Sequence, residues 1–548
     1  MENKDTLYLG LCLAGAVSAG AYTAGVIDYL LEALEDWENK RGQQNVPSHR
    51  VIIPAIGGAS AGGMTGTVMA SAVNNPITPV RALEKNIFEE QPQNKLYHSW
   101  VDLTTADMFP VLLSNSDITG KVYSLFNSRF IDDLSQRAIQ VDKSRFIDRP
   151  YFEKHLKLFT TLTNLKGFPY NVNFAGGHAK SVFYLSRHND YAAFVLNKTE
   201  DEYNNDGWIP LDFFRNSNVE IARSAAMATG AFPIGLRSRS VVRKIQHLND
   251  LLWHRDITRD FPLTMDPDNT LCVDGGMINN EPFFRVKDIL SGLLKEKAGN
   301  GEGFRLKEDP DTFECSMIMV DPFPSKPAEQ FEEKDGLTDV IGSTLSAMVA
   351  QMRMKPEALK QIYDKNNQSL YLIGPSRQVE GTSVEGEHAI ACGFFGGFGG
   401  FINKEFRIHD FFLGRGNCER FLREHFTVPA ESKNPIFKNG YKGTDPQLFK
   451  AKDGRRQIIP IFKPEAEKMY MPQFKHHESW PVRKSGEISS YKKAVRGRVG
   501  KIIMNLSDYS RRDRFLLRIG NKLILEKAIA GRFMNTIRES MEEWKLLK

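Results

Sequence analysis

Cysteine is scarce and widely spaced in this chain of 548 residues. The five cysteines are Cys12, Cys272, Cys315, Cys392 and Cys418, and no two of them form a C-x-x-C pair. The odd number and the wide spacing argue against a disulfide framework and against a cysteine zinc site. Both features favour a reducing compartment, and we therefore expect a cytoplasmic protein.

Long hydrophobic runs are also absent. No stretch of about 18 apolar residues occurs, so we expect any membrane contact to be peripheral. Residues 6–27 carry no charge, and residues 14–16 are similar to the small-residue cleavage site of a signal peptide. However, Glu2 and Asp5 outweigh Lys4 before this stretch, whereas a secretory signal begins with net positive charge. The sequence therefore favours a cytoplasmic protein over a secreted one.

Neither charged nor apolar residues are in excess over the whole chain. The 41% hydrophobic and 25% charged residues are typical of globular proteins and exclude long disorder, a fibre and a polytopic membrane protein. The formal net charge is +5, but residues 483–548 contain 17 Lys and Arg against 7 Asp and Glu. Such a basic segment fits anionic lipid headgroups or nucleic acid, and it also fits the solvated face of ordinary helices.

The N-terminal segment has the pattern of a strand, a small-residue turn and a helix. Residues 7–13 are apolar and strand-like, and apolar residues recur at helical spacing over 26–34. Residues 14–21 between them have little side-chain bulk, so backbone N–H groups at the helix start can contact an anion. A P-loop is excluded because Ala21 and Tyr22 stand where it needs Lys and Ser or Thr. An oxyanion hole and close packing of a helix on a strand both remain open.

A second small-residue turn contains the pattern G-x-S-x-G. Apolar residues 51–56 precede it, and Gly58, Ser60 and Gly62 form it. In a nucleophile elbow the serine lies at a sharp turn from strand to helix, and the two glycines relieve steric conflict. Parallel sheet topology would bring this turn beside the first one. Pro54 is unfavourable in a central strand because it cannot donate a hydrogen bond to the ladder.

No histidine stands in a comparable turn after a strand, but a carboxylate does. Residues 270–273 form a short apolar strand, and Asp274 follows directly, ahead of two glycines. The Asp-Gly-Gly sequence is either the base that activates Ser60 or an ordinary loop. Residues 266–269 lack the glycine and the final carboxylate of a calcium loop, so we predict no metal site.

Taken in chain order, these blocks resemble the patatin-like phospholipase family. The resemblance is carried by residues 11–27, 58–62, 158–167, 222–233 (ARSAAMATGAFP) and 274–282 (DGGMINNEP). It implies an α/β fold with a mostly parallel central sheet flanked by helices. It places the acyl hydrolase domain at residues 1–325, with an insertion at about 72–155, and leaves 326–548 as an α-rich C-terminal region.

The resemblance implies a serine lipid acyl hydrolase that cleaves acyl esters of membrane phospholipids through a Ser-Asp dyad, without a cofactor or metal. Asp274 would accept the Ser60 proton, and the N–H groups of Gly15, Ala16 and Val17 would stabilise the oxyanion. Two alternatives remain. One is a catalytically silent lipid-binding or scaffold protein of patatin fold, and the other is an α/β-hydrolase with a Ser-Asp-His triad.

One departure from the family pattern motivates the silent alternative. The family turn usually reads Gly-Gly-Gly-x-Arg-Gly, and Ala19 replaces the arginine here. A bacterial patatin-related branch is similar in this turn and at residues 398–421. Backbone N–H groups can still form the hole, and we expect the Ser18 side chain to contribute little.

Further predictions concern the residues beyond 325. We expect helices over 337–363 and a strand over 369–374, and residues 394–401 (FFGGFGGF) fit either a mobile aromatic loop or a tight packing turn. Apolar residues recur at helical spacing from Phe515 to Trp544, Ile529 among them, and favour a core-packed helix with a basic outer face. The basic residues 483–548 are the predicted contact with a phospholipid membrane surface. No nucleic acid partner is expected, and a homo-oligomer is left open.

Overall fold

The fold is taken from a computed structural model. It describes residues 5–83, 87–174, 181–258, 262–264, 268–298, 307–324, 336, 340, 367–474, 479–506 and 522–548. Apart from residue 340, the helices predicted over 337–363 lie outside the described residues, as does the first part of the predicted apolar stripe, residues 515–519.

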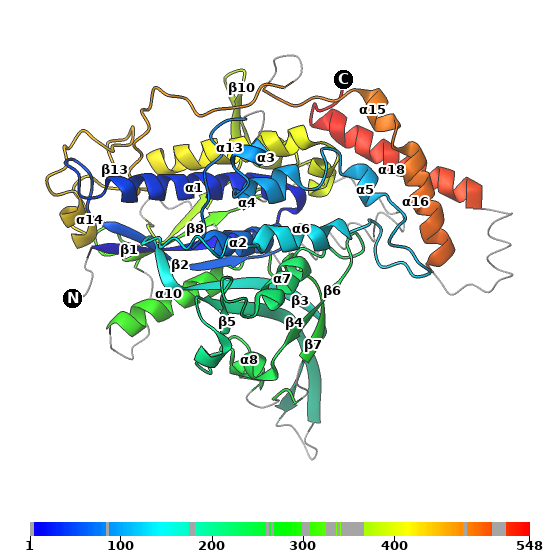
Figure 1. The fold of residues 1–548 in the computed structure, drawn as a ribbon, viewed down its shortest axis with the longest axis horizontal. Helices are drawn as coiled ribbons and strands as arrows, with labels where there is room; N and C mark the ends of the chain where they lie inside the picture. Colours follow the sequence, from blue (N-terminus) through cyan, green and yellow to red (C-terminus); the bar gives the residue numbers. More distant parts are fainter. Residues whose placement is uncertain are drawn as a thin grey trace.

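The sheet at the centre of the fold is mixed and mostly parallel (Figure 1). Its strands are β1 Thr6–Leu13, β2 Arg50–Gly58, β3 Phe152–Phe174, β4 Ser181–Leu196, β5 Ile209–Leu211, β6 Arg239–Arg243, β7 Asp268–Asp274, β8 Cys315–Val320 and β9 Leu370–Ile373. They follow the order β5-β4-β3-β2-β1-β8-β9, and β7 pairs with β3 and β6. All neighbours are parallel except β3–β4, β3–β7 and β6–β7. The predicted α/β class is confirmed.

Helices cover both faces of this sheet (Figure 1). The longer ones are α1 Gly20–Lys40, α2 Ala61–Ala72 and α13 Lys404–Glu424 on one face and α10 Phe283–Ala298 on the other. The shorter ones are α3 Ile87–Glu90, α4 Lys95–Tyr97, α5 Phe109–Leu112, α6 Phe130–Ile139, α7 Val219–Thr229, α8 Ile245–Asp250, α9 Arg255–Thr258, α14 Pro435–Gly440 and α15 Ser485–Ser489. Small hairpins are formed by β10 Ser376–Val379 with β11 Thr382–Glu385, and by β12 Thr427–Val428 with β13 Arg456–Gln457.

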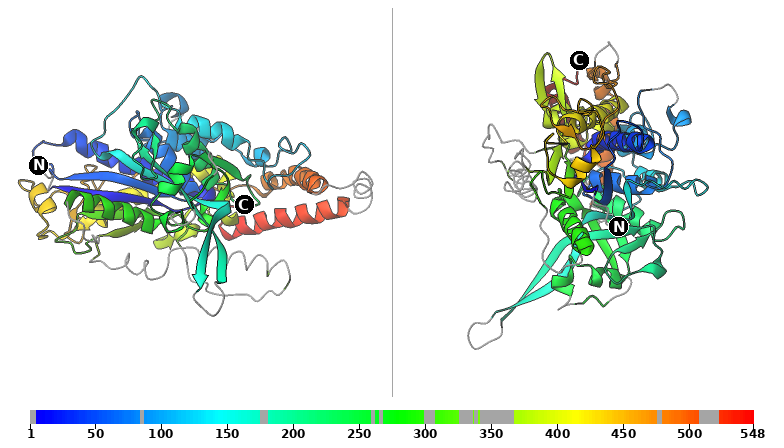
Figure 2. Two further views of the ribbon diagram at one scale, coloured as in Figure 1. Left: turned by 90° about the horizontal axis from the view of Figure 1, so that it is seen from below. Right: turned by 90° about the vertical axis from the view of Figure 1, so that its left-hand side faces the viewer.

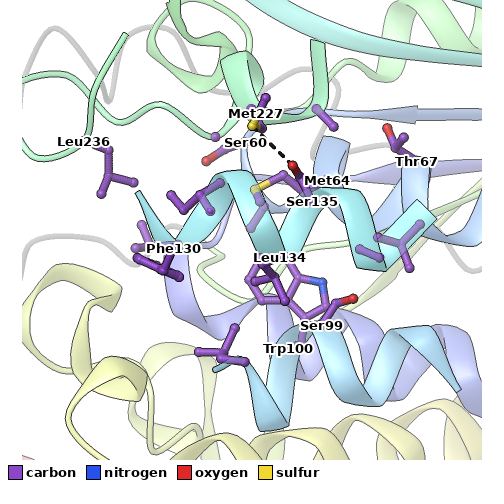
Figure 3. A pocket seen from close by; sticks show the side chains of 18 of the residues that line it. Ser60, Met64, Thr67, Ser99, Trp100, Phe130, Leu134, Ser135, Met227 and Leu236 are labelled. Atoms are coloured by element: carbon purple, nitrogen blue, oxygen red, sulfur yellow. Dashed lines mark hydrogen bonds between the residues drawn. The ribbon is translucent and has the colours of Figure 1, made fainter. Parts of the chain in front are cut away.

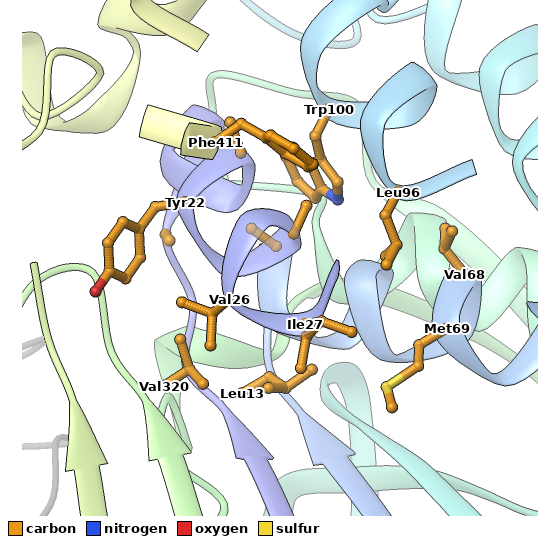
Figure 4. Close-up of a cluster of buried hydrophobic side chains, with 14 of the residues drawn as sticks. Leu13, Tyr22, Val26, Ile27, Val68, Met69, Leu96, Trp100, Val320 and Phe411 are labelled. Carbon is orange, nitrogen blue, oxygen red and sulfur yellow. The ribbon is translucent and has the colours of Figure 1, made fainter. Parts of the chain in front are cut away.

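Strand β1 shows why both faces are covered. Its leucines at alternate positions, from Leu7 to Leu13, join the core cluster under α1, whereas Tyr8 and Cys12 join the cluster under α10. Successive side chains of a strand point to opposite faces, so a strand that is apolar throughout must be buried on both sides. Figure 4 shows the α1 side, where Val26 and Ile27 pack over Leu13.

Pro54 lies inside β2 at an irregularity of both neighbouring ladders. Along β1, Tyr8 pairs with Ile52 but Gly10 pairs with Ala55, and the ladder with β3 shifts between Ile53 and Ala55 as well. A bulge leaves the extra residue out of the ladder, so a residue without an N–H is tolerated there. The predicted conflict between Pro54 and a central strand is resolved in this way.

The C-terminal region packs directly on the N-terminal one through α13 and α1. A Cβ atom on Gly25 would overlap the backbone oxygen of Phe411, and one on Gly414 would overlap that of Tyr22, so the two helices approach closely because both residues lack a side chain. The buried Arg415 of α13 also forms ion pairs with Asp28 and Glu32 of α1. The predicted domain boundary at residue 325 stays a prediction, although β9 extends the same sheet beyond it.

The last helices form a pair at one end of the molecule, and the β3–β4 hairpin extends away from the body (Figure 2). They are α16 Lys492–Asn505 and α18 Lys522–Glu543. On α18 the buried apolar residues include Ala530, Ile537 and Met541, whereas Ile529 is 42% exposed and was wrongly assigned to the buried stripe. Within the described ranges, no helix combines the length and apolar character needed to cross a bilayer.

Candidate active site

The C-terminal ends of β2 and β7 meet along one edge of β3. Strand β2 pairs with β3 as far as Gly58 opposite Thr160, and β7 takes over the same edge with Asp274 opposite Leu162. Because β2 is parallel to β3 and β7 is antiparallel to it, both strands end at this junction. The turns that carry Ser60 and Asp274 are therefore placed side by side by the register of β3.

Ser60 has the backbone geometry of a nucleophile elbow. Its φ of 50° and ψ of −128° lie in a region that non-glycine residues rarely adopt. A Cβ on Gly62 would overlap the Leu13 carbonyl oxygen, and a Cβ on Gly58 would lie 2.6 Å from the backbone of Gly62. Both glycines are thus required by the turn. Helix α2 starts at Ala61, so the positive end of its dipole lies beside the serine.

The Ser60 side chain donates a hydrogen bond to Asp274. The Oγ to Oδ2 distance is 2.6 Å, and the other carboxylate oxygen accepts from the Gly276 N–H at 2.7 Å. Asp274 is buried, and burial raises the pKa of its carboxyl to about 7, although both hydrogen bonds act in the opposite direction. A carboxyl with this pKa is able to exchange a proton near neutral pH.

The small-residue turn after β1 lies next to Ser60. A Cβ on Gly15 would overlap Asn280 Oδ1 and lie 2.9 Å from Ser60 Cβ. In the part of the chain that the structure describes, the N–H groups of Gly15, Ala16 and Val17 have no hydrogen-bond acceptor. Val17 also has a φ of 47°, which is strained for a β-branched residue. The predicted turn therefore offers free backbone donors close to the serine.

Ser18 connects this turn to the C-terminal region, which the sequence did not predict. Its Oγ accepts a hydrogen bond from the Gly400 N–H at 2.9 Å and donates to the Gly397 carbonyl oxygen. The buried Arg407 in turn donates to the Gly400 carbonyl oxygen at 2.5 Å. Ser18 thus braces the turn, and residues 394–401 form two short 3-10 turns with Phe394 buried, as expected of a tight packing turn.

An apolar cavity opens beside Ser60 and Asp274 (Figure 3). Its wall includes Met64 of α2, Leu134 of α6, Met227 of α7 and Trp100. Helix α6 belongs to the predicted insertion at 72–155, so this insertion supplies one side of the cavity. No histidine is among the described residues that line it. A cavity with Ser60 and Asp274 in its lining and mostly apolar walls fits an acyl chain whose ester lies at Ser60.

Sequence reasoning missed two side chains around the serine. Thr229 Oγ1 accepts the Ser60 N–H at 2.9 Å, and Asn280 Oδ1 lies against Gly15. Thr229 lies in the block 222–233 and Asn280 in the block 274–282. Their place in these blocks is the sequence signal that could have identified them. Among the described residues, no group of three or more His, Cys, Asp or Glu could hold a metal ion.

The family model described as patatin-like phospholipase matches residues 11–286. An uncharacterized protein of Sinorhizobium fredii, y4iI, is 31% identical in an alignment 478 residues long that covers 78% of this chain. The chain spans 65% of the length of that relative.

Among solved structures, VipD from Legionella pneumophila is 13% identical, with a TM-score of 0.20. That likeness covers 98% of this chain and 86% of the other, and a score this low supports no statement about the fold. The family model, by contrast, spans half of the chain and includes both β2 and β7. The chain therefore belongs to the patatin-like phospholipase family.

Proposed function

We propose that this protein is a serine lipid acyl hydrolase that cleaves acyl esters of phospholipids, with Ser60 as nucleophile and Asp274 as base. Family membership supports hydrolase activity in general. The observation that carries the finer proposal is the 2.6 Å hydrogen bond from Ser60 Oγ to Asp274 Oδ2 in the lining of a mostly apolar cavity. A nucleophile in hydrogen-bond reach of its base is the arrangement that acyl transfer needs.

In the first half of the reaction, Asp274 takes the proton of Ser60 as Oγ attacks the ester carbonyl carbon. The negative charge that develops on the carbonyl oxygen is stabilised by free N–H groups in the turn of residues 15–17. The tetrahedral intermediate then collapses, the bond to the alcohol oxygen breaks, and the alcohol leaves with the proton held by Asp274. The acyl group remains as an ester on Ser60.

In the second half, water replaces the alcohol. The water oxygen attacks the carbonyl carbon of the acyl-enzyme while Asp274 accepts a proton from this water. The same turn stabilises the second oxyanion. Collapse releases the fatty acid and returns the proton from Asp274 to Ser60 Oγ. The two halves use one base and one set of donors, so the dyad needs no further titrating side chain.

The rate of ester hydrolysis should rise with pH and level off above a pKa of about 7. Asp274 accepts a proton only when ionised, and burial raises its pKa to about 7, so lowering the pH through 7 removes the active form. The measurement is kcat/KM for a soluble chromogenic acyl ester between pH 5 and pH 9, with Ser60→Ala as the blank. A rate that stays level from pH 5 to pH 8 would contradict this role of Asp274.

Two alternatives are separated from the proposal by particular observations. A Ser-Asp-His triad needs a histidine near Ser60, and the described lining of the cavity contains none. A silent scaffold was suggested by Ala19, but that residue is fully buried, and the brace through Ser18 and Gly400 holds the turn although the turn itself contains no arginine. Turnover of the soluble ester by purified protein, absent in Ser60→Ala, decides between enzyme and scaffold.

A further inference from the structure

Four large apolar side chains are exposed on two segments that lie side by side. Tyr123 is 47% exposed, Leu125 45%, Phe232 37% and Ile234 68%. The segments are joined by backbone hydrogen bonds, because Leu125 N–H donates to the Ile234 carbonyl at 2.8 Å and the next pair of residues is bonded in the same way. We call these four residues the apolar rim. Single exposed apolar residues are ordinary, whereas a contiguous group marks an interaction surface.

The backbone at Ile234 is strained to hold this position. Its φ is 67°, and a β-branched residue in this region is a genuine outlier. Because the side chain is 68% exposed, its burial in the fold offsets little of the free energy of this backbone strain. Glycine or asparagine would adopt the same backbone with less strain, so an isoleucine at this place favours a function for the exposed side chain.

The apolar rim adjoins the cavity that contains Ser60. Phe232 is exposed and also lines the cavity, and its ring centroid lies 5.9 Å from that of Phe398. Phe398 packs in turn on Phe126, the residue after Leu125. Phe232 therefore connects the rim directly to the cavity.

Cations flank the apolar rim. The Arg237 guanidinium lies 4.3 Å from the ring centroid of Tyr123, and Lys121 Nζ lies 5.5 Å from it. Both cations are exposed and form no ion pair within the described ranges. A tyrosine with Lys and Arg beside it is typical of protein surfaces at the headgroup level of a membrane. At that level the apolar side chains enter the acyl layer and the cations contact lipid phosphates.

We propose that the apolar rim docks on an anionic phospholipid surface, with Leu125 and Ile234 entering the acyl layer and Lys121 and Arg237 contacting headgroup phosphates. This inference rests on the proposed function, because it locates the surface from which Ser60 receives its substrate. The charge of the flanking cations and the continuity with the cavity favour a lipid surface as the occupant.

One basic residue of the segment 483–548 supports this surface from behind. Arg498 of α16 donates to the Leu125 carbonyl at 2.8 Å and forms an ion pair with Asp117. On α18 the buried apolar side chains Ala530, Ile537 and Met541 face the protein. Arg498 thus positions the rim, and insertion is assigned to the rim itself.

The first test removes the apolar tips. The double variant Leu125→Gln/Ile234→Asn is compared with Leu252→Asn, since Leu252 is 66% exposed on a different part of the surface. Binding is measured by flotation with vesicles of phosphatidylglycerol and phosphatidylcholine, and turnover is measured on the same vesicles and on a soluble ester. We expect at least about tenfold weaker vesicle binding and a matching loss of vesicle turnover for the double variant, with soluble-ester turnover retained.

The second test reverses the flanking charges. Lys121→Glu/Arg237→Glu should weaken binding to the anionic vesicles by at least about tenfold at low salt and have little effect with pure phosphatidylcholine. Lys438→Glu/Lys442→Glu is the matched control, because these exposed cations lie in and after α14, at the end of the molecule opposite α16 (Figure 1). The difference should shrink as salt rises, since the Debye length falls to about 8 Å near physiological ionic strength.

The proposal would be overturned if both rim variants bound vesicles as well as the wild type while charge reversal at Lys492, Lys493 and Lys501 of α16 weakened vesicle binding. The basic segment would then be the membrane contact. Thermal unfolding of each variant shows that its fold is retained. Failure of the proposed function is recognised separately, because a wild type that hydrolyses no ester would still bind vesicles through the rim.

Discussion

Replacing Ser60 by alanine should lower kcat/KM for an acyl ester by about 10⁴-fold or more, and Asp274→Asn should lower it nearly as far. Ser60 Oγ donates to the buried Asp274 carboxylate, so each residue is ineffective without the other. The double variant should therefore be no slower than Ser60→Ala, because the effects of residues that act as a unit do not add. The measurement is steady-state hydrolysis of one soluble ester by all four proteins.

Thermal unfolding of Asp274→Asn shows whether a loss of activity in this variant reflects lost chemistry or a lost fold. Burial raises the pKa of Asp274 from 3.8 to about 7, so the wild type loses stability as the pH rises through that range and the carboxyl is forced to ionise. The asparagine variant has no such loss and should unfold at a higher temperature than the wild type at pH 8. If a folded Asp274→Asn retains more than about one per cent of activity while Ser60→Ala is inactive, the base lies elsewhere.

Filling the space at Gly15 should cost about 10²-fold or more in turnover. A Cβ there would overlap Asn280 Oδ1 and lie 2.9 Å from Ser60 Cβ, so Gly15→Ala should displace the turn from the serine. Gly15→Pro should have a larger effect, since it also removes one of the free N–H donors.

Gly531→Ala is the matched control for this substitution. Gly531 lies in α18, and a Cβ atom at that position would meet no other atom within 4 Å. It should leave turnover unchanged and keep or slightly raise the melting temperature. A Gly15→Pro protein that is soluble, folded and fully active would remove residues 15–17 from the mechanism.

The parts of the site that could be predicted from the sequence are those set by local structure. The glycines around Ser60 are required by its own turn, and Asp274 directly follows a strand that the residue pattern reveals. The two turns lie side by side because β2 runs parallel to β3 and β7 runs antiparallel to it, so both strands end at the same place along β3. The α/β class thus followed from the residue pattern, and the pairing of Ser60 with Asp274 followed from the resemblance.

The parts that could not be predicted depend on contacts between distant segments. Ser18 and Gly400 are 382 positions apart, and Ser60 and Thr229 are 169 apart, so no local pattern pairs them. Ile529 fits the helical period of the apolar stripe but is exposed, because packing against α15, α16 and the turn at 395–397 determines which face of α18 is covered. Tertiary packing overrides periodicity in such cases.

The most direct test of the central claim is lipid mass spectrometry on phospholipid vesicles exposed to the wild type and to Ser60→Ala. The proposed chemistry converts a phospholipid and water into a lysophospholipid and a fatty acid, in equal amounts for the first bond cleaved. We predict that both products accumulate with the wild type and that neither accumulates with Ser60→Ala. Equal product formation by the two proteins, or no loss of phospholipid with a wild type that binds the vesicles, would contradict the account.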